Sequence, residues 1–220
     1  MTDFARLMSD YFVKYLAGQK GSGSNTMKTY RDTFVQLLEF MDEKKHIRAD
    51  CIEVDSFSYD IINEFLEYLE KEKRVSISTR NNRLAAIRSF FKYTGYHEPK
   101  YLNISTSIRE ISKKKTEGRQ MNYLSVNAME HFLNSFDKTD HKELRCFCIV
   151  LLLYESGARV TELCNVRRYD LHLEKPYTMI LHGKGDKIRS VPLDGLVADV
   201  ISNYIQKYRV DDNDFLFFNT

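Results

Sequence analysis

The sequence of 220 residues has no tryptophan and only three prolines, nine glycines and four cysteines. So few cysteines exclude a disulfide-rich scaffold, and so few prolines and glycines exclude a low-complexity chain. The longest apolar run, from Cys146 to Tyr154, covers nine residues, whereas a membrane-spanning helix needs about 20. The N-terminus also lacks the basic and then apolar order of a signal peptide. We therefore expect an ordinary globular protein that stays in the cytoplasm.

The cysteines stand at positions 51, 146, 148 and 164, a spacing that fits no zinc-binding pattern. Free cysteines are commonly small core residues, so we expect inert buried thiols. No tract predicts a Gly-rich dinucleotide loop, a paired-histidine zinc helix or a nucleophile elbow. The sequence thus gives no reason to expect a metal or any other cofactor.

Positive charge is concentrated in one stretch. Residues 71–119 carry a net charge of +9, while residues 1–70 carry −5 and residues 120–220 carry −2. Such a concentration is typical of a surface that binds a polyanion. The alternative interpretation is a basic helix face that is merely solvated.

Apolar periodicity predicts four helices in the first part of the chain, at about residues 4–16, 24–41, 58–73 and 78–93, the last ending at Gly95. They predict a small helical domain over residues 1–98. Residues 99–122 lose this periodicity and gain basic residues, so we expect a basic linker there. Its basic residues are Lys113, Lys114, Lys115 and Arg119.

A second domain is expected over residues 123–220. Helical patterns cover about residues 125–133, 142–155, 159–166 and 194–208. Between them, residues 177–182 and 187–191 alternate with period two around a Gly-Lys-Gly turn, which predicts a β-hairpin. The fold class is therefore mainly α, with a small sheet in the second domain.

The first motif that can carry chemistry surrounds Arg159. This arginine follows a Gly-Ala helix break after a wholly apolar helix, so we expect it to lie deep. A buried guanidinium needs an acidic partner or an anionic ligand, and its planar fork suits two phosphate oxygens. Glu162 stands three residues later on the same helix face and is the expected partner. The alternative is an Arg–Glu pair that only stabilises the fold.

The second motif is Gly183-Lys184-Gly185 at the hairpin turn. It is no nucleotide-binding loop, because residue 178 is threonine and residue 185 is glycine, where that loop needs glycine and serine or threonine. Lys184 is instead expected at the tip of a hairpin, where it can reach a phosphate or a leaving oxygen. The alternative is a solvated turn lysine.

The third motif is a basic helix over residues 78–88. Arginine and asparagine read base edges in the major groove, and threonine and arginine also hold phosphates. The candidates for DNA contact in this helix are Thr79, Arg80, Asn81, Arg83 and Arg88. In the preceding helical segment they are Thr26, Lys28 and Arg31. A merely solvated face is the alternative.

Taken in order, these segments resemble the tyrosine recombinases, the phage integrase family, over the whole chain. The resemblance rests on the order and spacing of weak motifs: STRNNRL (78–84), the basic linker, GARVTEL (157–163), GKGDK (183–187), VPL (191–193) and DFLF (214–217). It implies an N-terminal four-helix, SAM-like core-binding domain that clamps DNA. It also implies the N-terminal part of an α+β catalytic domain.

The resemblance implies that Arg159 grips the scissile phosphate of double-stranded DNA. It further implies that Lys184 protonates the leaving 5′ oxygen and that Glu162 supports the site, with no metal needed. The family cleaves and rejoins strands through a 3′-phosphotyrosine. Its members work as tetramers on DNA, whereas we expect this chain to be a monomer in solution.

The family's later His-x-x-Arg and tyrosine nucleophile are missing. None of the six histidines is followed three residues later by arginine. All 14 tyrosines precede the place where the nucleophile is expected, so none is assigned. The apolar stretch at residues 215–218 also indicates a C-terminal truncation. We expect a recombinase fragment that binds DNA without cleaving it. The alternatives are a natural non-catalytic DNA-binding protein that competes with the complete recombinase, and a helical interaction module.

Overall fold

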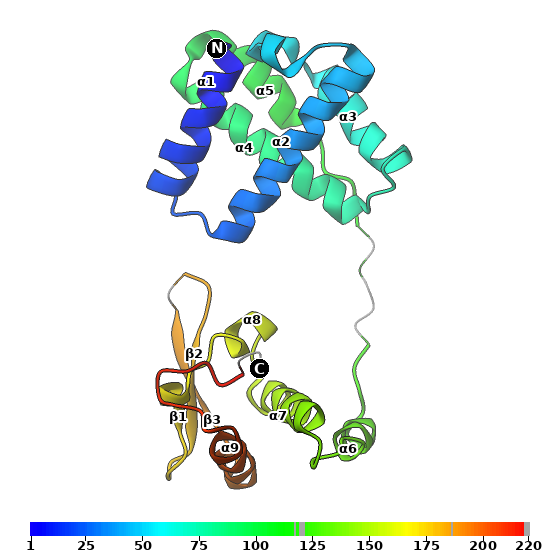
Figure 1. Cartoon of the computed structure of the whole chain (residues 1–220). Helices are drawn as coiled ribbons and strands as arrows, with labels where there is room; N and C mark the ends of the chain where they lie inside the picture. Colours follow the sequence, from blue (N-terminus) through cyan, green and yellow to red (C-terminus); the bar gives the residue numbers. More distant parts are fainter. Residues whose placement is uncertain (117, 119–121, 186, 218–220) are drawn as a thin grey trace. The chain divides into compact units, whose positions relative to one another are not determined.

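The computed structural model describes residues 1–116, 118, 122–185 and 187–217. It divides into two compact units, residues 1–119 and 120–220 (Figure 1). Each unit has its own hydrophobic core. Arg119, a predicted DNA-binding residue, lies outside the described residues. Within the described ranges, no helix combines the length and the apolar character that crossing a bilayer requires.

The first unit is built of helices. In chain order they are α1 (Asp3–Asp10), the π-helix η1 (Tyr11–Gln19), α2 (Ser24–Lys45), the 3₁₀ turns η2 (Ala49–Cys51) and η3 (Val54–Ser56), α3 (Tyr59–Lys71), α4 (Ile77–His97), the 3₁₀ turn η4 (Pro99–Tyr101) and α5 (Leu102–Glu110). Hydroxyl side chains cap several starts: Thr2, Ser58 and Ser76 each accept a hydrogen bond from the backbone three residues on. The four predicted helical regions are therefore present.

Two details of this unit differ from the sequence prediction. Residues 99–110 form η4 and α5 instead of a linker, and Ile108 and Ile111 are buried in the core. Gly95 does not end α4 but lies inside it, where an added Cβ would meet the Ser105 side chain at 2.6 Å. The glycine is needed because α5 packs closely against the end of α4. The missing side chain permits this close contact. The sequence pattern had instead predicted that Gly95 ends the helix.

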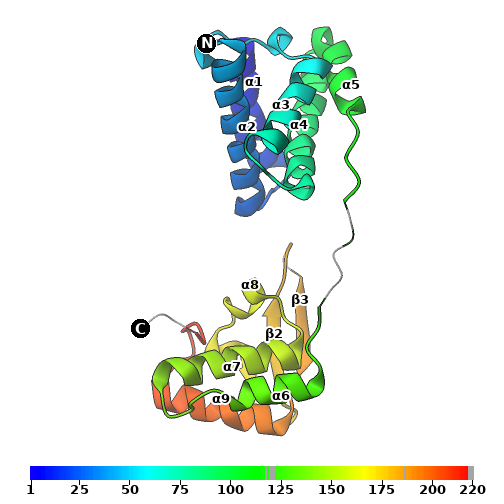
Figure 2. The same ribbon diagram turned by 90° about the vertical axis from the view of Figure 1, so that its right-hand side faces the viewer.

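The second unit combines helices with one small sheet. Its elements are α6 (Val126–Asn134), α7 (His141–Ser156), α8 (Val160–Leu163), the 3₁₀ turn η5 (Arg168–Asp170), β1 (Leu171–His172), β2 (Thr178–His182), β3 (Ile188–Pro192) and α9 (Gly195–Tyr208). Helix α7 lies against both α6 and α9, as Figure 2 shows. Gly157 ends α7 in the left-handed conformation with φ 58°, as predicted.

The sheet confirms the predicted hairpin and adds a strand. The order is β1-β2-β3, with both pairs antiparallel. Leu171 pairs with Met179, and Leu181 pairs with Arg189. Met179 and Leu181 are fully buried, so the side chains paired with them lie on the inner face of the sheet. Arg189 therefore shares a face with core residues.

Helix α7 is less buried than its apolar sequence predicted. Phe147, Cys148 and Leu152 are buried, whereas Cys146 and Tyr154 are exposed. Cys51 and Cys164 are exposed as well, so the expectation of four buried thiols is wrong for all but Cys148. Burial raises the pKa of the Cys148 thiol to about 12, which makes that thiol inert.

Candidate functional site

One buried carboxylate organises the candidate catalytic residues of the second unit. Glu162 in α8 is 3% exposed. Arg159 donates to it twice, from the backbone N–H to Oε2 at 2.9 Å and from Nη1 to Oε1 at 2.7 Å. Arg189 donates from Nη1 to Oε1 at 3.1 Å and from Nη2 to Oε2 at 2.7 Å. These donors, Arg189 foremost, lower the pKa of Glu162 to about 2, so the carboxylate stays ionised.

Arg159 is paired as predicted but not buried as predicted. Its side chain is 75% exposed, and that of Glu162 is 4% exposed. The reason is local: Gly157 turns the chain out of α7, and Arg159 then stands at the N-cap of α8 with an extended backbone. The buried member of the pair is the acid. An exposed guanidinium that is fixed on one side by a carboxylate can still donate to an external anion.

Sequence reasoning missed Arg189. The signal was present, because Arg189 stands opposite the inward-facing Leu181 in the hairpin. A charged residue at an inward position of a strand needs a charged partner. Glu162 is that partner, and the pair joins α8 to β3 across 27 positions of sequence.

The hairpin passes close to the same carboxylate at Gly183. A Cβ added at Gly183 would lie 3.2 Å from Glu162 Oε1 and 3.3 Å from the carbonyl oxygen of Lys187. The Gly183 amide donates to that carbonyl at 2.7 Å. Lys184 comes next and is exposed. The residue before the candidate lysine therefore lies beside the carboxylate that binds Arg159, with little space for a side chain.

A second contact holds the hairpin where β2 meets the turn. His182 Nε2 lies 3.1 Å from Oδ1 of Asp170, which is 2% exposed. The other oxygen, Oδ2, accepts the backbone N–H of Arg167 at 2.9 Å. The sequence pattern did not predict this pair. Together they fasten the end of β2 to η5.

The predicted DNA-binding residues of the first unit gather at one end of it. Nη1 of Arg83 in α4 donates to the Thr29 carbonyl in α2 at 3.0 Å and to Thr33 Oγ1 at 3.3 Å. Asn81 in α4 holds the segment after α5, donating to the Lys114 carbonyl at 2.8 Å and accepting from its N–H at 3.1 Å. Figure 1 shows the starts of α2 and α4 and the chain leaving α5 at this same end of the unit.

The predicted DNA-binding residues of the first unit differ in how exposed they are to solvent. The exposed ones, which we call the basic face, are Lys28, Arg31, Lys113, Lys114 and Lys115. The half-buried ones are Thr26, Thr79, Asn81, Arg83 and Arg88. The cations of the basic face belong to two segments that α4 holds together.

Arg80 is not on the open face where we expected it. It is 5% exposed, its Nε lies 3.2 Å from Glu70 Oε1, and its Nη1 donates to the Ser112 carbonyl at 3.1 Å. The reason is helical spacing, because Arg80 lies four and seven residues before the core residues Leu84 and Ile87. Arg80 is a buried tie between α3, α4 and the segment after α5.

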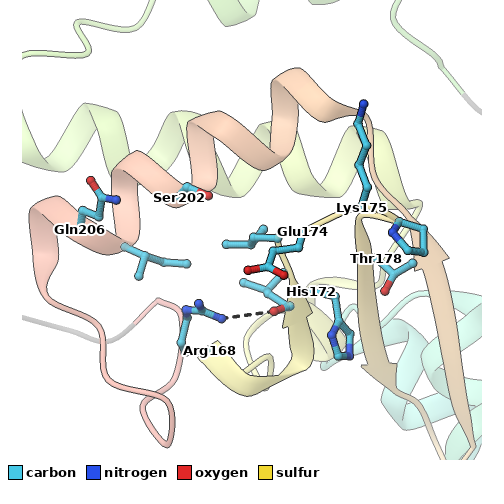
Figure 3. Close-up of a pocket in the computed structure, with 11 residues that line it drawn as sticks. Arg168, His172, Glu174, Lys175, Thr178, Ser202 and Gln206 are labelled. Carbon is cyan, nitrogen blue, oxygen red and sulfur yellow. Dashed lines mark hydrogen bonds between the residues drawn. The ribbon is translucent and has the colours of Figure 1, made fainter.

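A hollow of about 700 Å³ lies elsewhere in the second unit, between η5, β1 and α9 (Figure 3). Arg168, Glu174, Ser202 and Gln206 are among its lining residues. The Arg168 guanidinium donates to the Leu171 carbonyl at 3.2 Å. None of the residues that contact Glu162 lines this hollow, so it is separate from the candidate catalytic cluster.

Family models match both parts of the chain. The model of the phage integrase family matches residues 122–220, and that of the phage integrase N-terminal SAM-like domain matches residues 10–99. Tyrosine recombinase XerD of Listeria innocua is 30% identical over 224 residues, which cover 96% of this chain and 70% of XerD. The putative integrase/recombinase y4rC of Sinorhizobium fredii is 27% identical over 213 residues, covering 97% of this chain and 64% of y4rC. The chain therefore belongs to the tyrosine recombinases of the phage integrase family.

Solved structures share the fold. The XerH site-specific recombinase, bound to palindromic difH in a post-cleavage complex, matches with a TM-score of 0.67 and 22% identity over 96% of this chain and 61% of XerH. The Tn1549 transposon integrase in complex with transposon right end DNA matches with a TM-score of 0.68 and 19% identity over 100% of this chain and 72% of that structure. The predicted fold class is confirmed: mainly α, with a SAM-like N-terminal domain and a small antiparallel sheet. The chain spans less than two thirds of the length of y4rC and of XerH.

Proposed function

We propose that this chain binds double-stranded DNA and presents Arg159 and Lys184 to a phosphodiester in site-specific recombination. The observation that carries the proposal is the Glu162 cluster. In it, one buried carboxylate holds the exposed guanidinium of Arg159 and lies beside Gly183, the residue before Lys184. A planar guanidinium binds two phosphate oxygens at once, and an exposed lysine nearby can give a proton to a leaving oxygen.

The charge of the cluster suits this role. Glu162 contributes one negative charge against the two guanidinium groups of Arg159 and Arg189, so the cluster is left net positive. Fixed cationic donors stabilise the charge that develops on phosphoryl oxygens during strand transfer. Glu162 acts as the support that fixes the donors, without touching the phosphate itself.

DNA binding by the first unit is supported by the basic face. Lysine and arginine neutralise backbone phosphates and so supply most of the affinity for a duplex. The solved XerH and Tn1549 integrase structures hold DNA, which supports the same partner for this chain. We propose that the protein acts on DNA in the cytoplasm and is a monomer when free. The family resemblance implies assembly as a tetramer on DNA.

The 220 residues carry only part of the family's catalytic set. They include no histidine followed three residues later by arginine, and we assign no nucleophile among their tyrosines. We propose that this polypeptide binds without cleaving DNA by itself. The basic face also supports a second candidate function, a non-catalytic DNA-binding protein that competes with a complete recombinase for its sites.

The proposal is tested with a fluorescent 40-base-pair duplex and with the same duplex carrying a nick that traps covalent protein–DNA adducts. We expect salt-sensitive binding in an anisotropy titration and no adduct on a denaturing gel. Changing Lys113, Lys114 and Lys115 together to glutamine should weaken binding by about tenfold, at roughly 0.5 kcal/mol per phosphate contact.

The matched control changes three exposed lysines of the second unit, Lys142, Lys175 and Lys207, to glutamine. The control alters net charge equally. Equal weakening of binding in both triple variants would therefore overturn the proposal that the basic face contacts DNA. A covalent adduct formed by the wild-type chain would overturn the proposal that this polypeptide does not cleave DNA by itself. A duplex affinity that does not change with salt concentration would overturn the proposed contacts with the DNA backbone.

A further inference from the structure

Arg189 is the residue of the Glu162 cluster to which the proposed chemistry assigns no individual role. Its guanidinium grips both oxygens of Glu162 from β3, while Arg159 approaches the same carboxylate from the N-cap of α8. The Arg189 side chain is 40% exposed. It therefore needs an explanation, either as a ligand contact or as a support.

We propose that Arg189 is a positioning residue that fixes, through Glu162, both Arg159 and the hairpin that carries Lys184. The inference rests on the proposed function, because it gives Arg189 a role in aligning the two groups that would meet the phosphodiester. Arg189 itself is not assigned a contact with DNA.

The geometry makes the carboxylate a joint among three segments. Oε1 accepts from Nη1 of Arg159 at 2.7 Å and from Nη1 of Arg189 at 3.1 Å. The same oxygen lies 3.2 Å from the place of a Cβ on Gly183. Oε2 accepts from the Arg159 backbone at 2.9 Å and from Nη2 of Arg189 at 2.7 Å. Rotation of the carboxylate would break contacts to α8 and β3 together.

Charge explains why a second arginine is useful here. A carboxylate bound by Arg159 alone would compete with a phosphate for that guanidinium. Because Arg189 occupies both carboxylate oxygens in a bidentate pair, Glu162 is neutralised from β3 and Arg159 remains available to an external anion. A lysine could supply the charge but not the fork.

The first test is amide hydrogen exchange of the complete 220-residue chain without DNA, measured by NMR. The reporter amides are Arg159, which donates to Glu162, and Gly183, which donates to Lys187. Arg189→Gln should speed exchange at both by at least about tenfold while leaving the buried Ala198 amide of α9 unchanged. Arg189→Lys should restore part of the protection.

Lys187→Gln is the matched control, because it removes an exposed cation from the same hairpin without removing a contact to Glu162. It should leave the Arg159 reporter unchanged. Unchanged reporters in Arg189→Gln would overturn the proposal. Equal acceleration at Ala198 would also overturn it, because Arg189 would then only stabilise the unit as a whole.

The second test is a double-mutant cycle on the salt dependence of duplex binding. Each phosphate contact contributes about 0.9 to the slope of log affinity against log salt. Arg159→Gln and Arg189→Gln should each reduce the slope by about that amount, and the double variant should reduce it no further. An additive loss of about 1.8 would show that Arg189 contacts a phosphate itself, which contradicts a positioning role. If neither the wild-type chain nor any variant binds the duplex, the DNA-binding proposal fails, and the exchange result still decides the role of Arg189.

Discussion

The carboxylate of Glu162 gives the second unit a pH-dependent contribution to stability. Its pKa is lowered from an ordinary 4.5 to about 2, first by Arg189 and then by Arg159. The folded chain therefore binds this proton less readily than the unfolded chain. The contribution is complete above pH about 4.5 and is lost as the pH falls through about 2. We expect urea unfolding of the second unit to require less denaturant as the pH falls across this window.

Glu162→Gln identifies the group responsible. The variant lacks the titrating carboxylate, so the difference in unfolding midpoint between wild type and variant should shrink as the pH falls from 4.5 towards 2. Glu174→Gln is the matched control, because Glu174 is an exposed carboxylate of the same unit. A difference that stays constant over the window would contradict the assignment to Glu162.

Single arginines show how far sequence reasoning reached at this scale. The spacing of Arg159 and Glu162 predicted their pairing, which the structure confirms. Burial was harder to predict, because a guanidinium can point to either side of its backbone. Arg159 was expected inside and lies outside, whereas Arg80 was expected outside and lies inside. For Arg80, the helical spacing to the core residues Leu84 and Ile87 indicates the buried position that the structure shows.

At the scale of elements, Gly95 marks the contact between α4 and α5. Gly95→Ala would bring a Cβ within 2.6 Å of Ser105 Oγ and 2.8 Å of its Cβ. We expect the first unit to lose about 1–3 kcal/mol of stability, the usual cost of overpacking. Urea unfolding followed by circular dichroism measures the change.

Gly18→Ala provides the comparison for this substitution. Gly18 is also helical, and its added Cβ would meet just the Val13 carbonyl oxygen at 3.6 Å, an ordinary contact. We expect this variant to be neutral or more stable by up to about 1 kcal/mol, because alanine favours helices. Equal losses in both variants would contradict the specific role of Gly95.

Helix α5 shows why some elements escape sequence analysis. Residues 99–122 look basic and irregular as a whole, and this average hides the short apolar stripe that ends with Ile108 and Ile111. Those two side chains are buried only because α4 and α3 offer them a surface. The β-hairpin, in contrast, was predictable because its alternation and its glycine turn are local signals.

Asn81 connects α4 to the basic segment. Both its amide oxygen and its amide nitrogen bind the Lys114 backbone, so we expect Asn81→Ala to release residues 113–115. Two hydrogen bonds of about 1 kcal/mol each hold the segment, and duplex affinity should fall by about three- to tenfold. Amide exchange at Lys114 and an anisotropy titration measure the two effects.

Asn82→Ala serves as the control for Asn81. Asn82 is exposed on the same helix, so its removal should leave exchange at Lys114 unchanged. Loss of DNA affinity in Asn81→Ala without faster exchange at Lys114 would contradict the bracing role. It would favour direct contact between Asn81 and DNA.

At the scale of the whole chain, the two units divide the work that we propose. The first unit carries the basic face on α2 and on the segment that α4 holds, and the second carries the Glu162 cluster. Each unit has a separate core, which explains why apolar periodicity alone predicted both. Charge distribution placed the proposed DNA-binding region within residues 71–119. It could not reveal that Arg80, within these residues, is buried.

The salt dependence of duplex binding by the complete chain tests the central claim most directly. If the basic face and Arg159 together meet four or more backbone phosphates, log affinity should fall against log salt with a slope of about −4 or steeper, at about −0.9 per phosphate. Fluorescence anisotropy with a 40-base-pair duplex at several potassium chloride concentrations gives this slope. A steep slope that flattens in the Lys113, Lys114 and Lys115 triple variant is the predicted result. Affinity that stays constant as salt rises would contradict DNA binding by this chain.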